Sequence, residues 1–186
     1  MLKFLEFKRK IIEIGFFFKV SISKIVSYII YSRIIFLSKP KTHTGIDPSS
    51  DKNIIVSLTT LPHRTKSSLI TIYYLLFQEE IRPNKIILWI TESENQTFKA
   101  LNKRGRKLLE KLKQYGLEIH QTEDIGPLTK FLPTKEHYPN SIIVTSDDDI
   151  IYPRKWLKNL YESYLKSPEH IHCYRAHNMT FHDCGR

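Results

Sequence analysis

Cysteine is nearly absent from this chain, which has only Cys173 and Cys184 in 186 residues. Two thiols can form at most one bridge, so a disulfide-rich scaffold is excluded and a reducing compartment is favoured. The sequence also lacks internal repeats and low-complexity tracts. With 41% hydrophobic and 12% aromatic residues, the chain is expected to bury one core in a domain of ordinary size.

Long uncharged hydrophobic runs are missing as well. Residues 1–41 are rich in Ile and Phe, but Glu13, Lys19, Lys24 and Arg33 interrupt them. A membrane-spanning helix needs about 20 mostly apolar residues, and Lys19 also breaks the pattern of a secretory signal. This segment is predicted to be a basic, apolar helix, which either lies on an anionic membrane surface or packs on the rest of the protein.

Acidic residues are fewer than basic ones, at 19 against 29, which gives a formal net charge of +10. Residues 1–41 hold nine Lys or Arg and two acids, whereas residues 42–186 hold twenty and seventeen. The excess therefore belongs mainly to the N-terminal segment, and the nearly balanced remainder argues against a nucleic-acid partner. We expect a cytoplasmic protein, with peripheral attachment to the inner face of the membrane if residues 1–41 are an anchor.

The rest of the chain alternates between two kinds of segment. Residues 42–52 have a linker composition, and residues 53–186 are expected to form one domain. Short β-branched runs predict strands, apolar residues at helical spacing predict helices, and their alternation predicts an α/β fold: a mostly parallel sheet with helices on both faces. The predicted strands are 53–58, 85–90, 117–121, 141–146 and 170–176, and the predicted helices are 65–78, 98–116 and 153–167.

Polar side chains follow each of the first four predicted strands. In a parallel sheet the ligand binds beyond the carboxyl ends of the strands, so these side chains are expected to meet at one edge. Hydroxyls, cations and a carboxylate cluster together suit a diphosphate held with a divalent metal. The residues in question are Thr59, Thr60, His63 and Arg64; Thr91, Glu92 and Glu94; Glu123, Asp124 and Lys130; and Asp147, Asp148 and Asp149.

Three adjacent carboxylates, Asp147, Asp148 and Asp149, end an apolar run. They repel one another unless a cation or hydrogen-bond donors compensate, and no protein cation is obvious beside them in the sequence. Oxygen ligands favour Mg²⁺ or Mn²⁺ over zinc, so we predict such an ion. In an extended chain Asp147 and Asp149 point to one side, about 6.6 Å apart, and Asp148 to the other; a bend would decide which pair meets the ion.

Four segments in this order, IIVSLTTLPHR, PNKIILWITE, EDIGPLTKFLP and IIVTSDDDIIYPRKWLKNLYESYLKSP, resemble the donor-binding half of glycosyltransferases with the GT-A fold, close to the family 2 type. The resemblance covers roughly residues 53–180, and the Asp-x-Asp metal motif of that fold matches Asp147 to Asp149. Many relatives have Asp-x-Asp-Asp, which places Ser146 where an acid is usual and leaves the individual roles of the aspartates open.

The resemblance implies a Rossmann-like nucleotide-binding half, a sugar-nucleotide donor and a glycan or lipid-linked acceptor, in bacterial-type surface glycan synthesis. It implies that Thr59, Thr60 and Arg64 lie near the nucleotide, Glu92 near the base or ribose, and Lys130 near the donor phosphate or sugar. Asp147 would contact the donor, and Asp147, Asp148 and Asp149 would supply the metal ligands, with His177 as a further candidate.

Plainer interpretations stand beside these. The aspartates could cap the helix that follows Pro153, Arg64 and Lys130 could form surface ion pairs, and the two threonines could simply end a strand. Glu92 could be an ordinary turn acid. A zinc site is a further reading of the C-terminal His and Cys residues, but their spacings match no closed zinc site. These residues are His170, His172, Cys173, His177, His182 and Cys184.

Two other function classes remain open. A Mg²⁺-dependent aspartyl phosphatase also places an acidic loop after a strand, usually the first, whereas here three predicted strands precede it. A non-enzymatic basic module could use residues 1–41 to bind a membrane or nucleic acid. In the glycosyltransferase interpretation, the general base and acceptor cleft come from sequence after the metal motif. Residues 150–186 offer only Asp183 as a weak candidate base, so we expect an incomplete, donor-binding half with little transfer activity.

Overall fold

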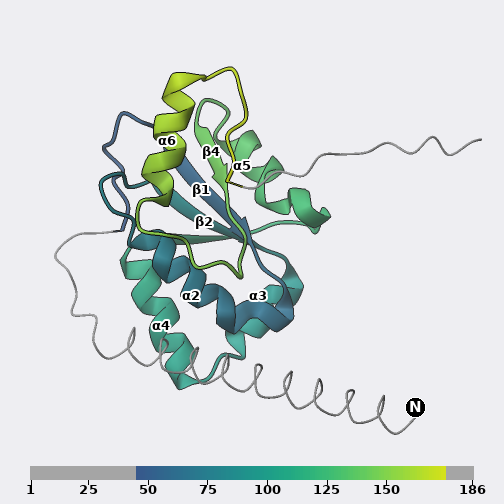
Figure 1. Cartoon of the computed structure of the whole chain (residues 1–186). Coiled ribbons are helices and arrows are strands. Elements are labelled where there is room, and N and C mark those ends of the chain that lie inside the picture. The colour runs from purple at the N-terminus through teal and green to yellow at the C-terminus, as the bar shows by residue number, and fades with distance from the viewer. Residues whose placement is uncertain (1–44, 175–186) are drawn as a thin grey trace, which may run out of the picture.

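The computed structural model describes residues 45–174 (Figure 1). The predictions for residues 1–41, for His177 and for Asp183 lie outside the described residues, as do His177, His182 and Cys184 of the six residues considered for zinc. Within residues 45–174 no helix has the length and apolar character needed to cross a membrane.

Four strands form one parallel sheet in the order β3-β2-β1-β4. Strands β1 and β2 lie in the middle, and nearly all of their residues are buried, which is why they read as continuous apolar runs. The strands are β1 (Ile54–Thr59), β2 (Lys85–Ile90), β3 (Leu117–Gln121) and β4 (Ile142–Thr145). The predicted α/β fold and its first four strands are confirmed.

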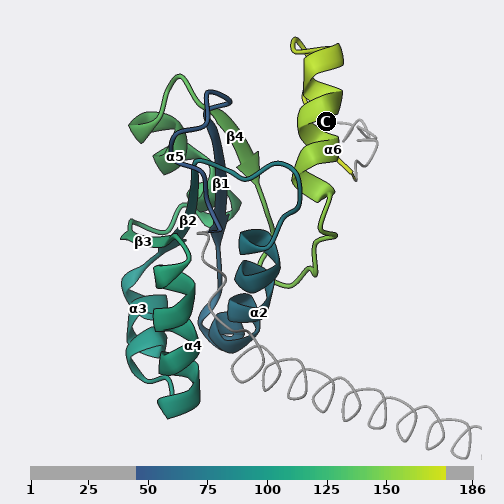
Figure 2. The same ribbon diagram turned by 90° about the vertical axis from the view of Figure 1, so that its left-hand side faces the viewer.

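Helices cover both faces of this sheet, as predicted, and Figure 2 shows α5 and α6 on opposite sides of it. The 3-10 helices η1 and η2 follow β1 and β3. The helical elements are η1 (Pro62–Arg64), α2 (Thr65–Leu76), α3 (Glu92–Lys99), α4 (Lys103–Gln114), η2 (Gly126–Lys130), α5 (Leu132–His137) and α6 (Trp156–Lys166).

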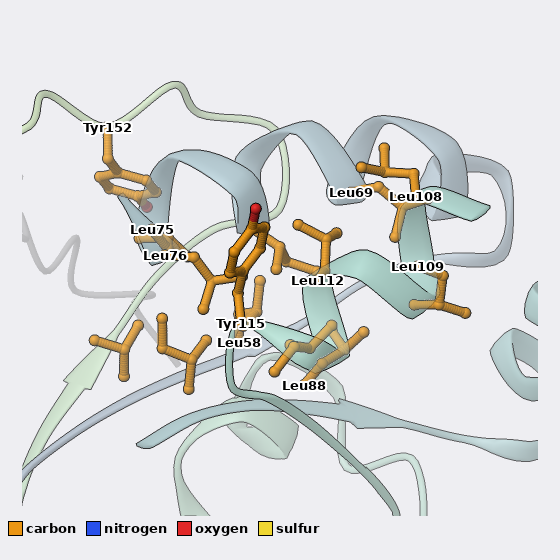
Figure 3. Packing of buried hydrophobic residues seen from close by; sticks show 14 of the residues in the cluster. Leu58, Leu69, Leu75, Leu76, Leu88, Leu108, Leu109, Leu112, Tyr115 and Tyr152 are labelled. Atoms are coloured by element: carbon orange, nitrogen blue, oxygen red, sulfur yellow. The ribbon is translucent and has the colours of Figure 1, made fainter. Parts of the chain in front are cut away.

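The larger core lies between the sheet and helices α2, α4 and α6. Alternate residues of β1, Val56 and Leu58 among them, pack there with Leu112 of α4 and Leu157 of α6. Figure 3 shows Leu58 and Leu88 of the sheet facing Leu112 and Tyr115. The opposite side chains of β1 and β2 form a smaller apolar cluster on the α5 face, made of Ile55, Ile87 and Trp89 with Tyr138 packed against it.

Two sequence predictions are corrected. The single helix expected over residues 98–116 is two helices, because α3 ends at Lys99 and Asn102 caps the start of α4, where its side chain accepts a hydrogen bond from the Gly105 amide at 2.9 Å. The fifth strand expected at 170–176 is not formed by its described part, residues 170–174, where Ile171 is 97% exposed. Helix α5 was not predicted, since it has only six residues and too little periodicity to register.

The strand order places a topological switch point between β1 and β4. From β1 the chain continues to β2 and β3 on one side, and it then returns to β4 on the other side of β1. The register pairs Ser57 with Thr145, and the Ser146 amide donates to the Ser57 carbonyl at 2.9 Å. Residues that directly follow β1 and β4 therefore lie side by side, in the position where open α/β sheets bind ligands.

Candidate functional site

An open pocket of about 320 Å³ lies at this carboxyl edge of the sheet. It is built from the segments after β1, β2, β3 and β4, as the sequence pattern predicts for a ligand site. Six of the predicted donor and metal residues line it: Thr59, Thr60, Arg64, Lys130, Asp147 and Asp148. Thr91, Glu94, Asp124, Gly126 and Thr129 are also in the lining.

The two threonines at the end of β1 make hydrogen bonds within the protein. Thr59 Oγ1 donates to the main-chain oxygen of Trp89 at 3.0 Å, which ties β1 to β2. Thr60 is only 3% exposed, and its Oγ1 donates to Oδ2 of Asp148 at 2.6 Å. Both residues border the pocket, but their hydroxyl hydrogens are directed to protein oxygens.

Asp148 is the buried member of the three aspartates. Its side chain is 7% exposed, its Oδ2 accepts from Thr60, and its Oδ1 accepts from Nη1 of Arg64 at 3.1 Å. Its main-chain oxygen accepts from Oγ1 of Thr71, in α2, at 3.0 Å. Each carboxylate oxygen of Asp148 therefore has a donor from the protein.

Asp147 and Asp149 point outward, with side chains 55% and 51% exposed. Asp149 Oδ2 lies 2.9 Å from Nη1 of Arg64, and Asp147 Oδ1 lies 2.5 Å from Nζ of Lys130. The alternation agrees with that of an extended chain. The expectation that no protein cation stands beside the acids is wrong, because two cations reach them from loops distant in sequence.

Arg64 joins two of the acids through one nitrogen. The hydrogen bond to Asp148 and the attraction of Asp148 and Asp149 raise the pKa of the guanidinium above its ordinary value. Arg64 is the last residue of η1 and the N-cap residue of α2. It is therefore a permanent positive charge at the mouth of the pocket.

Tyr152 binds the main chain of the acidic segment, a contact that the sequence analysis did not predict. Its hydroxyl accepts a hydrogen bond from the Asp147 amide at 2.8 Å, and its ring packs on Trp156 with centroids 4.3 Å apart. Burial raises the pKa of Tyr152 to about 12, so the phenol stays neutral. Spacing alone did not identify this role, because Tyr152 also fits the apolar pattern that leads into α6.

Ser146, which stands where relatives in the resemblance carry an acid, is 2% exposed. Its Oγ has no hydrogen-bond partner among the described residues. A carboxylate in this position would be buried without compensation, which is unfavourable. The acids of this chain accordingly begin one residue later, at Asp147.

Lys130 ends η2, just before α5, and α5 is bound to the sheet by a hydrogen-bond network on the face opposite the larger core. Thr134, in α5 just after η2, lies 2.7 Å from Ser57 Oγ and accepts the indole N–H of Trp89 at 2.7 Å. The turn before Lys130 has Gly126 at φ +66, a left-handed conformation that favours glycine. The Thr134 contacts fix α5, which directly follows η2, against β1 and β2. The signal that could have revealed them is the buried tryptophan, whose N–H needs a partner.

Glu92 is not among the residues that line the pocket. It is exposed, it accepts from Gln121 Nε2 at 2.9 Å, and hydrogen bonds from Asn95, Gln96 and Gln121 lower its pKa. Glu94 lines the pocket instead, and its carboxylate accepts the Thr91 amide at 2.8 Å. The spacing Thr-x-x-Glu from Thr91 to Glu94 is that of a capping box, a signal present in the sequence.

Residues 45–174 contain no group of three or more His, Cys, Asp or Glu side chains arranged to hold a metal ion. His172 is engaged by Ser163 and Ser167, and His170 by Glu169. Asp147 and Asp149 do fit an ion of the Mg²⁺ class, which takes one or two carboxylates and completes its shell with phosphate oxygens and water. Their exposure leaves room for such ligands.

No protein-family model and no curated protein matches the sequence. Among solved structures, the chain is similar to the mannosyltransferase PcManGT from Pyrobaculum calidifontis in complex with GDP-Man and Mn2+. The identity is 20% and the TM-score 0.44, over 74% of this chain and 39% of that one. The chain thus spans about two fifths of that protein's length, and the likeness, being coarse, does not by itself assign a function.

Proposed function

We propose that this chain binds a nucleotide-diphosphate sugar together with Mg²⁺ or Mn²⁺ and serves as the donor-binding part of a glycosyltransferase. The observation that carries the proposal is the meeting of two cations and an exposed carboxylate at one pocket: Arg64 follows β1, Lys130 follows β3, and Asp147 follows β4. A second exposed carboxylate, Asp149, is outside the lining and lies 2.9 Å from Arg64. The pocket also lies at the switch point of the sheet.

The charges suit a metal diphosphate better than either ion alone. The guanidinium of Arg64 and the ammonium of Lys130 are donors for phosphate oxygens. The exposed carboxylates of Asp147 and Asp149 are ligands for the divalent ion. Since the charges of the ion and the diphosphate offset each other, the pair can enter without upsetting the charge balance of the site.

The chemistry that follows is the departure of a nucleoside diphosphate from a sugar. When bound, the ion would neutralise the negative charge that develops on the leaving group. Arg64 and Lys130 would stabilise the same charge through fixed N–H donors. We extend the proposal to a glycan or lipid-linked acceptor and to bacterial-type surface glycan synthesis, as the sequence resemblance implies.

Thermal-shift measurements with nucleoside diphosphates and nucleotide sugars, each with Mn²⁺ and with chelator, test the proposal. We expect a diphosphate to raise the melting temperature and Mn²⁺ to enlarge that rise, because ion and diphosphate are linked. Nucleosides without phosphate are the ligand control. No stabilisation by any nucleotide, in either condition, would contradict the function.

A matched pair of arginine variants locates the effect. Arg64→Met should remove most of the stabilisation by diphosphate. Arg154→Met should retain it, because Arg154 forms a similar ion pair with Glu79 at 2.8 Å but does not line the pocket. Stoichiometric capture of beryllium fluoride with Mg²⁺ would instead support the aspartyl phosphatase alternative.

A further inference from the structure

We infer that the three aspartates have two separate tasks: Asp147 and Asp149 face the metal, whereas Asp148 is a positioning residue that holds Arg64 for the diphosphate. This inference rests on the proposed function and assigns roles that the acidic motif alone leaves open. The first observation behind it is exposure, because Asp147 and Asp149 are half exposed while the side chain of Asp148 is 7% exposed.

The second observation is that both oxygens of the Asp148 carboxylate are engaged by protein donors. Oδ2 receives the Thr60 hydroxyl at 2.6 Å, and Oδ1 receives Arg64 at 3.1 Å. Asp148 borders the pocket, but a shift of its carboxylate toward a metal would lengthen both contacts and would leave the buried Thr60 hydroxyl without its acceptor. Unpaired buried polar groups are costly, so the present contacts favour Asp148 staying where it is.

The third observation is the main chain. Thr71 Oγ1, from α2, donates to the Asp148 carbonyl at 3.0 Å, which fixes the backbone as well as the side chain. Asp148 therefore joins the end of β1, the helix α2 and the segment after β4. A residue held from three directions is well suited to orient another side chain and poorly suited to follow a ligand.

Arg64 is the side chain that it orients. One guanidinium nitrogen, Nη1, lies 3.1 Å from Asp148 and 2.9 Å from Asp149. A guanidinium has several N–H donors in a rigid plane, so fixing one nitrogen also sets the direction of the others. With its side chain 39% exposed, Arg64 can present those donors to an anion in the pocket.

Charge and position predict opposite results for Asp148, and this makes the inference testable. If Asp148 acts only as a negative charge, its removal should strengthen the binding of an anion, as should the removal of Asp149. If Asp148 positions Arg64, its removal should weaken anion binding despite the loss of a repelling charge. Inorganic diphosphate in the presence of chelator is the probe, because it isolates the anion site from the metal.

We expect Asp148→Ala to weaken diphosphate binding, measured by calorimetry on the full chain, by roughly tenfold or more, since losing a buried charged partner costs more than about 1.4 kcal/mol. Asp148→Asn should restore part of the affinity, because its amide oxygen can still accept from Arg64. Thr60→Val, which changes no charge, should weaken binding in the same direction. If Asp148→Ala proves unable to fold, this last variant still decides the matter.

Mn²⁺ binding, followed by the electron paramagnetic resonance of the free ion, supplies the second readout. Asp147→Asn and Asp149→Asn should lower Mn²⁺ affinity at saturating diphosphate, where weaker diphosphate binding no longer affects the result, while Asp148→Asn should leave it close to the wild-type value. Glu79→Ala, which removes the partner of Arg154 outside the pocket, should change neither readout.

Asp148→Ala or Thr60→Val binding diphosphate as tightly as the wild type, or more tightly, would overturn the inference. So would an Asp148→Asn variant that loses Mn²⁺ as completely as Asp147→Asn. A wild-type chain that binds neither diphosphate nor any nucleotide would overturn the proposed function and the inference together, whereas the first two outcomes leave the function standing.

Discussion

Nζ of Lys130 lies 2.5 Å from Oδ1 of Asp147, so the ammonium proposed for the diphosphate and a carboxylate proposed for the metal are partners of each other. The Lys130 side chain is 24% exposed and that of Asp147 is 55% exposed, which makes the pair accessible to ligands. A metal diphosphate would give each group a new partner. A metal ion arriving alone must compete with Lys130 for Asp147.

This competition predicts the behaviour of Lys130→Met. Bare Mn²⁺ should bind the variant more tightly than the wild type, by up to about fivefold, because a partly exposed ion pair contributes about 0.2 to 1 kcal/mol. Diphosphate binding in chelator should weaken in the same variant. Titration of free Mn²⁺ by electron paramagnetic resonance measures the first effect, and calorimetry the second.

Lys85→Met is the matched control for that experiment. Lys85 pairs with Glu118 at 2.6 Å and has a similar exposure, but it lies at the start of β2, at the opposite end of the strand from the pocket. It should leave Mn²⁺ affinity unchanged. An equal affinity for Mn²⁺ in Lys130→Met and the wild type would show that the Lys130 pair does not compete with metal.

The second prediction separates Glu92 from Glu94. Glu92→Gln should leave nucleotide affinity within about twofold of the wild type, because this exposed residue bonds to Gln121 and not to the pocket. Glu94→Ala should lower the free energy of unfolding by about 1 kcal/mol, since it removes the capping box at the start of α3. Urea unfolding and nucleotide titration measure the two effects, and a large loss of nucleotide affinity in Glu92→Gln would restore the role that the resemblance implies.

The third prediction concerns Thr134, which bonds to both Ser57 and Trp89. Thr134→Val keeps the shape of the side chain but leaves the Trp89 N–H and the Ser57 hydroxyl without this partner. The free energy of unfolding should fall by about 1 to 3 kcal/mol. Thr134→Ser should recover most of it, and Thr145→Val, at an exposed position of β4, is the control. A Thr134→Val variant as stable as the wild type would show that these hydrogen bonds do not stabilise the packing of α5 on the sheet.

The fourth prediction concerns Tyr115, which is 6% exposed and whose hydroxyl has no hydrogen-bond partner among the described residues. Burial raises its pKa above the ordinary value of 10.0. Above pH 10 the unfolded chain therefore loses this proton more readily than the folded chain, and stability falls as pH rises. Below pH 10 the tyrosine is neutral in both states and contributes no such slope.

Tyr115→Phe should reduce the decline in the urea midpoint between pH 9 and pH 11, because phenylalanine has no proton to lose. At neutral pH the variant should be at least as stable as the wild type, since it removes a buried hydroxyl and keeps the ring packed on Phe77, 5.3 Å away between centroids. Tyr174→Phe, at an exposed site, is the control. An undiminished decline in Tyr115→Phe would assign the pH dependence to other groups.

Much of the fold was predictable because its signals are local. The β-branched runs of β1 and β2 are buried on both sides, and the leucines of α4 recur at helical spacing on one face. The break between α3 and α4 was missed because Phe98 and Leu101 continue the apolar pattern across it, and Asn102 alone marks the boundary. Residues 170–174 contain strand-forming types but pair with none of the four strands.

The position of the site in the fold was predictable from the sequence, but the contacts between its side chains were not. Parallel strands bring their carboxyl ends to one edge, which is enough to gather Thr60, Arg64, Lys130, Asp147 and Asp148. Which cation meets which acid depends on loops such as η1 and η2, whose course follows no sequence period. The contact between Arg64 and Asp148 joins residues 84 positions apart, and only the folded chain shows it.

The pocket side chains that face the ligand follow the strands, while the side chains of the core lie within strands and helices. The exposed groups at Lys130, Asp147 and Asp149 can therefore be exchanged with little effect on folding, so substitutions there can change what the proposed site binds while the fold is kept. Thr60 and Asp148 are different, because both are buried. A lineage that lost the proposed binding would be expected to keep these two residues longest, because their hydrogen bond also joins the end of β1 to the segment after β4.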